Sequence, residues 1–340
     1  MRRGSHASSE RPCGRHFRHP IERPGPGDAV LLRAGLIRPT ETAGVRYSPQ
    51  SQLPQLSFRL RFFFASRRGK PFVLNTHGSL LGFEKYLPPG WRQWPYRLYD
   101  ALTFRQTARK ACAVIVSSKM EYQDALEFGI DRNRLHIIPM GIDLDEGTLP
   151  SPSRIHDAPL HLLFVGRIAR VRRVELLLQA AARLTFPWRA TIVGGEAQTS
   201  SMSPPGYVRE LVHLAETLGI RDKVHFAGSQ PPDQLRSWYR AADIFIYPSL
   251  YENFSQPLLE AAAERLPIIS TRVGIAPELI REGETGFIVT GDPASLASRI
   301  EMLKDPDVRH TMGNRLRQRV KEQFGWDQII DRYLDLYQSL

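Results

Sequence analysis

The chain has 340 residues, of which 42% are hydrophobic and 24% charged, and its formal net charge at pH 7 is +11. This composition excludes collagen, coiled-coil and wholly disordered proteins, and no apolar run reaches the roughly 20 residues that span a bilayer. Residues 1–70 hold 14 Lys/Arg against 4 Asp/Glu, whereas residues 71–340 hold 32 against 31, so the basic charge is confined to the N-terminal part and nucleic acid is not indicated as a partner.

Residues 1–57 are rich in Arg and Pro and show no sustained periodicity, so we expect an atypical or disordered arm. A regular architecture begins near residue 58. Apolar strands are predicted at 71–76, 113–116 and 135–138, with a helix over 119–128, and they define a first domain over residues 58–150. Residues 85–110 mix Trp and Tyr with Arg and Lys, which is typical of interfacial segments and equally of interdomain packing.

A second domain is predicted over residues 151–325, after a Ser/Pro-rich linker. Six short apolar strands, at 160–165, 190–193, 224–227, 244–247, 268–271 and 286–289, alternate with helices such as 174–184 and 208–218. This alternation predicts a doubly wound parallel sheet that binds its ligand at the carboxyl ends of the strands. Helices at 296–303 and 308–324 follow, and we expect the last helix, within 326–340, to pack back towards the N-terminal domain.

Four arginines in seven residues, 167–173, follow the first strand of the second domain. Guanidinium groups at that position suit a diphosphate, although a solvated charge run before a helix gives the same pattern. The sequence contains neither G-x-G-x-x-G nor a P-loop, so a dinucleotide oxidoreductase or an NTPase is poorly supported.

Two glutamates flank the start of a predicted helix at 258–264. Ser255 is the expected N-cap and Pro257 lies in the first turn, so the helix N-terminus would face an anion such as pyrophosphate. Eight residues of helix rise about 12 Å, so Glu252 and Glu260 are not expected to reach the ~5 to 9.5 Å separation of glycoside hydrolases. The alternative is a helix-entry acid at Glu252 and an exposed helix residue at Glu260.

His77 follows the predicted strand at 71–76. A histidine at a strand end can act on a substrate held between two domains. A hydrogen-bonded loop histidine with no chemical role is the ordinary alternative.

Together these motifs resemble the retaining nucleotide-sugar glycosyltransferases of family 4, which have two Rossmann-like α/β domains in the glycosyltransferase-B fold. The resemblance covers about residues 70–340. It rests on the segments 164–167, 242–249, 267–271, 274–278 and 283–286, on Glu252 and Glu260 as the E-x7-E motif, and on 76–78 and 138–143 in the first domain.

The resemblance implies that Arg167 and Arg172 neutralise the donor diphosphate, with no metal or other cofactor. Glu260 is expected to hydrogen-bond the ribose. His77 and Glu252 are the expected catalytic residues, lying near the transferred sugar.

Two further pairs of residues are assigned by the same resemblance. Phe254 and Ser255 are expected to meet the donor phosphate and sugar through their backbone. Gly228 and Ser229 are expected to contact the base.

The chain departs from the family pattern in several places. Arg172 and Arg173 stand where the family usually has Lys and Gly, and Arg265 and Ile275 stand where it generally has glycines. Residues 1–57 lack the N-terminal strand and glycine-rich loop of the family, so we expect the first domain to be truncated or atypical.

The predicted function is retaining transfer of a hexosyl or N-acetylhexosaminyl group from a nucleotide-diphosphate sugar to a glycan or lipid-linked acceptor. The alternative is a catalytically inactive nucleotide-sugar-binding remnant of such an enzyme. Two cysteines cannot form a disulfide framework, and no secretory signal is visible, so we expect a cytoplasmic protein. A peripheral contact with the cytosolic face of a membrane is compatible with a lipid-linked acceptor.

Overall fold

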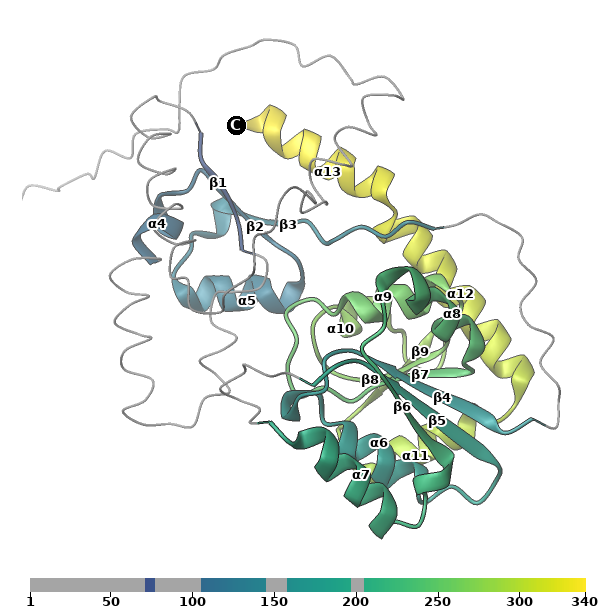
Figure 1. Ribbon diagram of the computed structural model, residues 1–340. Coiled ribbons are helices and arrows are strands. Elements are labelled where there is room, and N and C mark those ends of the chain that lie inside the picture. Colours follow the sequence, from purple (N-terminus) through teal and green to yellow (C-terminus); the bar gives the residue numbers. More distant parts are fainter. Residues whose placement is uncertain (1–70, 77–104, 145–157, 197–204) are drawn as a thin grey trace, which may run out of the picture. The chain divides into compact units, whose positions relative to one another are not determined.

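The computed structural model describes residues 71–76, 105–144, 158–196 and 205–340. Within these ranges the chain forms two parallel β-sheets with connecting helices (Figure 1). The predicted α/β class is therefore confirmed. His77 and residues 85–104 of the aromatic basic segment lie outside the described residues.

The first sheet is small and parallel, with the order β1-β2-β3. All four residues of β2 are buried, which explains their uninterrupted apolar sequence. Helix α5 begins where Ser118 accepts a hydrogen bond from the backbone of Glu121, and it ends at Gly129, whose φ of 91° is left-handed. The elements are β1 (Val73–Asn75), α4 (Arg105–Lys110), β2 (Ala113–Val116), α5 (Lys119–Phe128), η4 (Arg132–Arg134) and β3 (Leu135–Ile137).

The second sheet has six parallel strands in the order β6-β5-β4-β7-β8-β9. Its first strand in the chain, β4, lies in the middle, so the strand order reverses between β4 and β7. In such sheets the loops at this reversal diverge and leave a crevice at the carboxyl ends of the strands, where ligands bind. The strands are β4 (Leu160–Val165), β5 (Trp188–Val193), β6 (Val224–Gly228), β7 (Ile244–Tyr247), β8 (Ile268–Thr271) and β9 (Gly286–Val289).

Helices cover both faces of this sheet (Figure 1). Helices α6, α7 and α11 lie on one face, and α8, α9, α10 and α12 lie on the other. Every residue of β4 and of β7 is buried, as expected for strands covered on two sides. The helices are α6 (Val174–Ala181), α7 (Tyr207–Thr217), α8 (Pro232–Ala241), α9 (Gln256–Ala263), α10 (Ala276–Leu279), α11 (Pro293–Met302), α12 (Pro306–Phe324) and α13 (Trp326–Ser339), with 3-10 turns η5 (Arg170–Arg172) and η6 (Arg221–Lys223).

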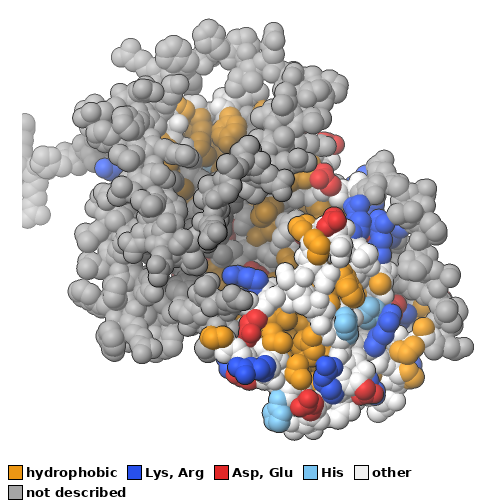
Figure 2. Space-filling view, in the orientation of Figure 1, with side chains coloured by type: hydrophobic (Ala, Val, Ile, Leu, Met, Phe, Trp, Pro, Cys, Tyr) orange, Lys and Arg blue, Asp and Glu red, His pale blue; other side chains and the backbone are white. Residues whose placement is uncertain are grey.

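Residues Val73–Tyr333 form one compact unit, and the last residues of α13 fall outside it. The predicted boundaries at 57, 150 and 325 stay predictions, as do the packing of residues 326–340 and the truncated or atypical first domain. Figure 2 shows acidic and basic side chains interspersed on the visible face of the described residues, in keeping with their near-neutral sequence. None of the described helices is long and apolar enough to cross a membrane.

Candidate donor-binding site

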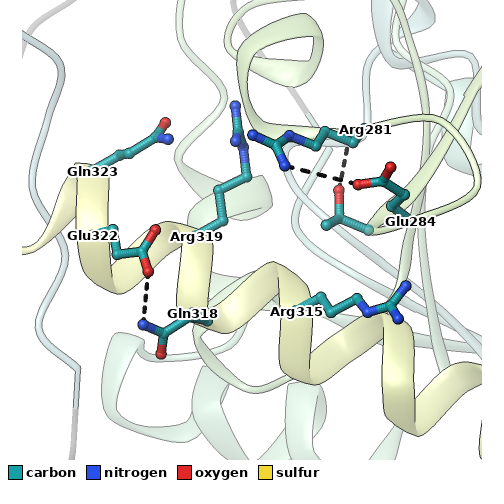
Figure 3. Close-up of a pocket in the computed structure, with 8 residues that line it drawn as sticks. Arg281, Glu284, Arg315, Gln318, Arg319, Glu322 and Gln323 are labelled. Carbon is teal, nitrogen blue, oxygen red and sulfur yellow. Dashed lines mark hydrogen bonds and ion pairs between the residues drawn. The ribbon is translucent and has the colours of Figure 1, made fainter.

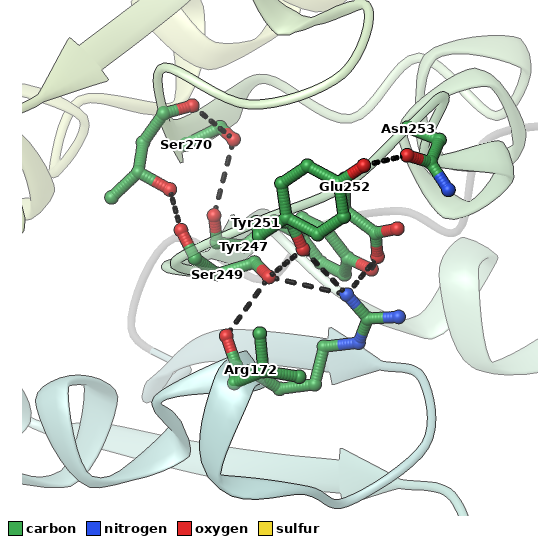
Figure 4. Close-up of polar contacts among 9 residues, drawn as sticks. Arg172, Tyr247, Ser249, Tyr251, Glu252, Asn253 and Ser270 are labelled. Atoms are coloured by element: carbon green, nitrogen blue, oxygen red, sulfur yellow. Dashed lines mark hydrogen bonds and ion pairs between the residues drawn. The ribbon is translucent and has the colours of Figure 1, made fainter. Parts of the chain in front are cut away.

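The loops that follow β4 and β7 are tied together at the point where the strand order reverses. Arg172, in the loop after β4, donates hydrogen bonds through Nη1 to the Ser249 hydroxyl at 3.2 Å and the Tyr251 carbonyl at 3.0 Å. The backbone N–H of Leu250 donates to the Val171 carbonyl at 2.7 Å. The sequence motif of clustered arginines is therefore anchored to the segment that carries Glu252 (Figure 4).

Arg172 also forms an ion pair with Glu252, again through Nη1. Only 12% of the Arg172 side chain and 14% of the Glu252 side chain are exposed, so the pair is largely shielded from water. The Nε and Nη2 atoms of Arg172 have no hydrogen-bond partner within the described part of the chain. One edge of the guanidinium is thus held by the protein while the other is available to an anion.

Glu252 is held from a second side by Tyr247, the last residue of β7, whose hydroxyl donates to Oε1 of the carboxylate. Burial first, and then the negative charge of Glu252, raise the pKa of the Tyr247 phenol, while the charges of Arg172 and Arg167 oppose this shift. Both arginines are therefore close enough to act on the same phenol. Arg167 is exposed, and among the described residues it has no hydrogen-bond or ion-pair partner.

Glu260, in α9, is held by a different tyrosine. The hydroxyl of Tyr239, in α8, donates to Oε2 of Glu260 at 2.7 Å. Burial raises the pKa of the Glu260 carboxyl, and the Tyr239 hydrogen bond partly reverses that shift. The alternative interpretation of Glu260 as an exposed helix residue is wrong, because its side chain is half-buried and hydrogen-bonded.

A row of aromatic rings joins the two tyrosines. The ring centroid of Phe245 lies 5.6 Å from that of Tyr239 and 5.9 Å from that of Tyr247, and Phe164 stacks on Tyr247 at 5.8 Å. Glu252 and Glu260 are therefore positioned by opposite ends of one packed aromatic group. Sequence reasoning missed both tyrosines as positioning residues. The available signal was that Tyr247 ends the predicted strand just before the E-x7-E motif and that Tyr239 lies shortly before the same strand.

Helix α9 begins at Gln256, two residues earlier than predicted, and Pro257 lies in its first turn, as predicted. Ser255 occupies the N-cap position, as predicted, but its side chain forms no capping hydrogen bond. The physical reason is its left-handed backbone, with φ of 78°, because side-chain capping requires an extended N-cap residue. The buried Ser255 hydroxyl has no partner within the described residues, which makes it a polar atom that a ligand oxygen would satisfy.

The loop after β8 packs against the N-terminus of α9. A Cβ atom on Gly274, which has φ of +51°, would lie 2.4 Å from the Phe254 carbonyl oxygen and 2.6 Å from the Ser255 hydroxyl. The N–H of Ile275 donates to the same Phe254 carbonyl at 2.9 Å. Glycine at 274 thus lets two strand-end loops close around the two residues expected to meet the phosphate and sugar.

Gly228 and Ser229 lie at the end of β6, on the same edge of the sheet. The N–H of Gly194 donates to the Gly228 carbonyl at 2.8 Å, and Ser229 lies against Gly195. A Cβ atom on Gly194 would come within 1.9 Å of the Gly166 carbonyl. The expected base-binding loop is thereby linked to the arginine-bearing loop after β4 through the close approach of Gly194 to Gly166. Gly194 was not singled out from the sequence.

His77 lies outside the described residues, so eight of the nine residues expected in the site are placed. Seven of the eight lie at strand ends or in the segments that follow the strands at the carboxyl edge of the six-stranded sheet, and Glu260 lies within α9. Among the described residues, no group of three or more His, Cys, Asp or Glu side chains is arranged to hold a metal ion. The expectation that no metal takes part stays a prediction.

Two parallel β-sheets with connecting helices are the architecture of the glycosyltransferase-B fold, and solved structures of that fold match this chain. A family model described as "Glycosyl transferases group 1" matches residues 146–319, and one described as "Glycosyltransferase Family 4" matches residues 51–146. The chain belongs to the group 1 glycosyl transferases, and the resemblance to family 4 is confirmed.

Two curated relatives are named D-inositol 3-phosphate glycosyltransferase. The one from Xylanimonas cellulosilytica is 31% identical over 328 residues, covering 92% of this chain and 77% of that protein. The one from Corynebacterium urealyticum is 32% identical over 255 residues, covering 69% of this chain and 58% of that protein. Another relative of the same name, from Acidothermus cellulolyticus, is covered over 49% of its length. The chain therefore spans between about half and three quarters of the length of these relatives.

Solved structures with the same fold include sucrose-phosphate synthase from Thermosynechococcus elongatus, with a TM-score of 0.71 and 25% identity, covering 88% of this chain and 82% of that one. HepE from Anabaena, crystallised with UDP and glucose, has a TM-score of 0.70 and 20% identity, covering 84% of this chain and 76% of that one. The HepE likeness is evidence for the fold alone.

Proposed function

We propose that the chain is a retaining glycosyltransferase that moves a hexosyl or N-acetylhexosaminyl group from a nucleotide-diphosphate sugar to a glycan or lipid-linked acceptor. The observation that carries the proposal is the pairing of Arg172 with Glu252 at the strand-order reversal, with one guanidinium edge available and Arg167 nearby. Family membership supports the same class of reaction.

Negative charge accumulates on the diphosphate when the bond between the sugar and its phosphate oxygen breaks. Guanidinium groups already in position stabilise such charge in the transition state more than in the ground state. In the proposed site Arg172 and Arg167 supply this stabilisation, and the backbone of Phe254 and Ser255 meets the phosphate and sugar. No metal ion is required by this arrangement.

The two glutamates have separate roles in the proposal. Glu260 accepts hydrogen bonds from the ribose hydroxyls, for which its carboxylate must be ionised, and Gly228 and Ser229 contact the base. Glu252 contacts the transferred sugar, together with His77 from the first domain. Their attachment to different tyrosines supports this division of roles over a paired acid and base.

Neighbouring proteins suggest which substrates to try first. HepE was crystallised with UDP and glucose, so UDP-sugars are the first donors to test. The curated relatives are named for D-inositol 3-phosphate, so a polyol phosphate belongs among the acceptors tested beside glycans and lipid-linked sugars.

Calorimetric titration with UDP-, GDP- and ADP-sugars tests the proposal directly. The wild-type chain is expected to bind one nucleotide class, whereas Glu260→Ala and Arg167→Ala bind it at least tenfold more weakly, since each loses a charged hydrogen-bonding group. Turnover is followed in the same samples, and the anomeric configuration of the product is read by NMR. Binding without turnover would favour an inactive sugar-nucleotide-binding protein, and a folded chain that binds no donor would refute both.

A further inference from the structure

A hollow of about 540 Å³ opens between α12 and the segment that precedes β9. None of the residues that line it belongs to the donor-binding site. Three arginines, Arg281, Arg315 and Arg319, contribute to its wall together with Glu284 and Glu322 (Figure 3). The remaining lining side chains are polar, so the hollow does not suit an apolar ligand.

The three arginines place positive charges close together in this hollow. Arg315 and Arg319 are one helical turn apart on α12, a like-charge spacing that destabilises a helix. Arg319 donates to the Glu278 carbonyl at 2.7 Å, which fixes its guanidinium, and Figure 3 shows it pointing towards Arg281. Burial, and then the charge of Arg281, lower the pKa of Arg319. A bound anion would relieve this repulsion.

The glutamates offset only part of that charge. Glu322 accepts a hydrogen bond from the Gln318 amide at 2.8 Å, and Glu284 lies 3.8 Å from Arg281 in a pair whose side chains are 63% and 59% exposed. An exposed pair at that distance is weak and readily exchanged. Arg315 has no hydrogen-bond or ion-pair partner among the residues that the structure describes.

A second hollow, of about 480 Å³, adjoins the first, because Gln318 lines both. Among the described residues, Arg265, Arg317 and Lys321 line it together with the uncharged Leu144 and Asn314. Arg317 and Lys321 repeat the like-charge spacing of one helical turn on α12. Of the described residues that line the two hollows, six carry cationic and two carry anionic side chains.

We propose that the first of these hollows binds a phosphate-bearing anion, separately from the donor-binding site. Arginine forks match the oxygen geometry of phosphate, and Arg281, Arg315 and Arg319 supply three of them there. Two sources supply such chemistry: a soluble diphosphate ester, or the headgroups of an anionic lipid surface.

Inorganic pyrophosphate is the probe for the soluble source. Calorimetry on the wild-type chain is expected to resolve two binding events, one lost in Arg172→Ala and the other weakened at least tenfold in Arg281→Ala/Arg315→Ala, which loses two charged donors. Both of these arginines are exposed, so the double variant is expected to fold. Arg183→Ala/Arg209→Ala, which removes two other exposed arginines, is the matched control. Arg281→Lys/Arg315→Lys is expected to retain part of the affinity.

Flotation with phosphatidylglycerol vesicles, compared with phosphatidylcholine vesicles, tests the lipid source. Because residues 1–70 are strongly basic, the readout is the difference between the two double variants and not binding as such. Weaker flotation of Arg281→Ala/Arg315→Ala than of Arg183→Ala/Arg209→Ala assigns the site to lipid phosphate, and a difference with pyrophosphate alone assigns it to a soluble ligand. Equal behaviour of the two double variants in both assays would overturn the proposal.

Discussion

Replacing Tyr239 with phenylalanine removes one hydroxyl and nothing else from the site. That hydroxyl donates to Glu260 at 2.7 Å, and Tyr239 is only 1% exposed, so water does not easily take its place. A hydrogen bond to a charged group contributes about 1.5 to 3 kcal/mol, which is the expected loss of unfolding free energy. The phenylalanine ring still packs on Phe245, so no cavity is expected.

The same change acts on Glu260. Burial raises the pKa of its carboxyl and the Tyr239 hydrogen bond lowers it, so Tyr239→Phe raises the pKa further and disfavours the ionised form. Proposed ribose binding requires that ionised form, so donor affinity falls as pH decreases through the pKa. Calorimetry across the weakly acidic to neutral range is expected to show this loss beginning at a higher pH in Tyr239→Phe, with a donor Kd about tenfold higher.

Tyr207→Phe is the matched control. Tyr207, in α7, is 3% exposed and donates its hydroxyl to Glu175, a similar buried tyrosine–glutamate bond that lies outside the proposed site. Both variants are expected to lose stability, but only Tyr239→Phe is expected to lose donor affinity and to change its pH dependence. If both variants lost stability equally and bound donor as the wild type does, the assignment of Glu260 to the ribose would be refuted.

Arg172→Ala leaves Glu252 largely buried without its cation, so thermal and chemical unfolding should show a loss of about 3 kcal/mol together with lost turnover; an unchanged stability would contradict the shielded pair. Gly194→Ala places a Cβ 1.9 Å from the Gly166 carbonyl oxygen, so we expect the free energy of unfolding to fall by about 3 kcal/mol and donor binding to weaken. A wild-type melting curve would count against this close approach. Arg173 has φ of 53°, so Arg173→Gly keeps the left-handed backbone without its cost of about 1 to 2 kcal/mol but loses the hydrogen bond to the Gly291 carbonyl. Denaturant titration should show a small net gain in stability, and a clear loss would contradict this estimate of the strain.

Three strands were predictable to the residue, namely Leu160–Val165, Ala113–Val116 and Ile268–Thr271. Each is short and buried at every position. Strand β5 begins two residues earlier than predicted, at Trp188, because the exposed Arg189 interrupts the apolar run. Helix α8 was not predicted as an element, since Tyr239 is its one fully buried residue and its apolar stripe is short.

The site was predictable in its charged groups and not in the groups that position them. Glu252 and Arg172 stand out in the sequence because they follow strands, but their contact depends on β4 and β7 being neighbours. The hydrogen bond between Tyr239 and Glu260 spans 21 residues and two helices, and only the packing of α8 on α9 brings the groups together. Pairings of this kind follow from tertiary structure and leave no local pattern.

Backbone conformation explains why glycine is usual at two of the positions where this chain departs from the family pattern. Arg173 and Arg265 stand where glycine is usual, and both have left-handed backbones, with φ of 53° and 60°. Ile275, at a third such position, has φ of −83°, which any residue adopts. The Arg173 side chain donates to the Gly291 carbonyl at 2.7 Å, which offsets part of the strain that glycine would avoid.

The ion pair between Arg172 and Glu252 has an entropic consequence for the proposed donor site. A free arginine side chain loses rotamer freedom worth about 2 kcal/mol when it is ordered, a factor of roughly 30 in affinity. For Arg172 that ordering has already taken place on folding, since Ser249, Tyr251 and Glu252 hold one edge of its guanidinium. Arg167 has no such partners among the described residues, so its ordering accompanies ligand binding, and the two arginines contribute to the same diphosphate with different binding entropies.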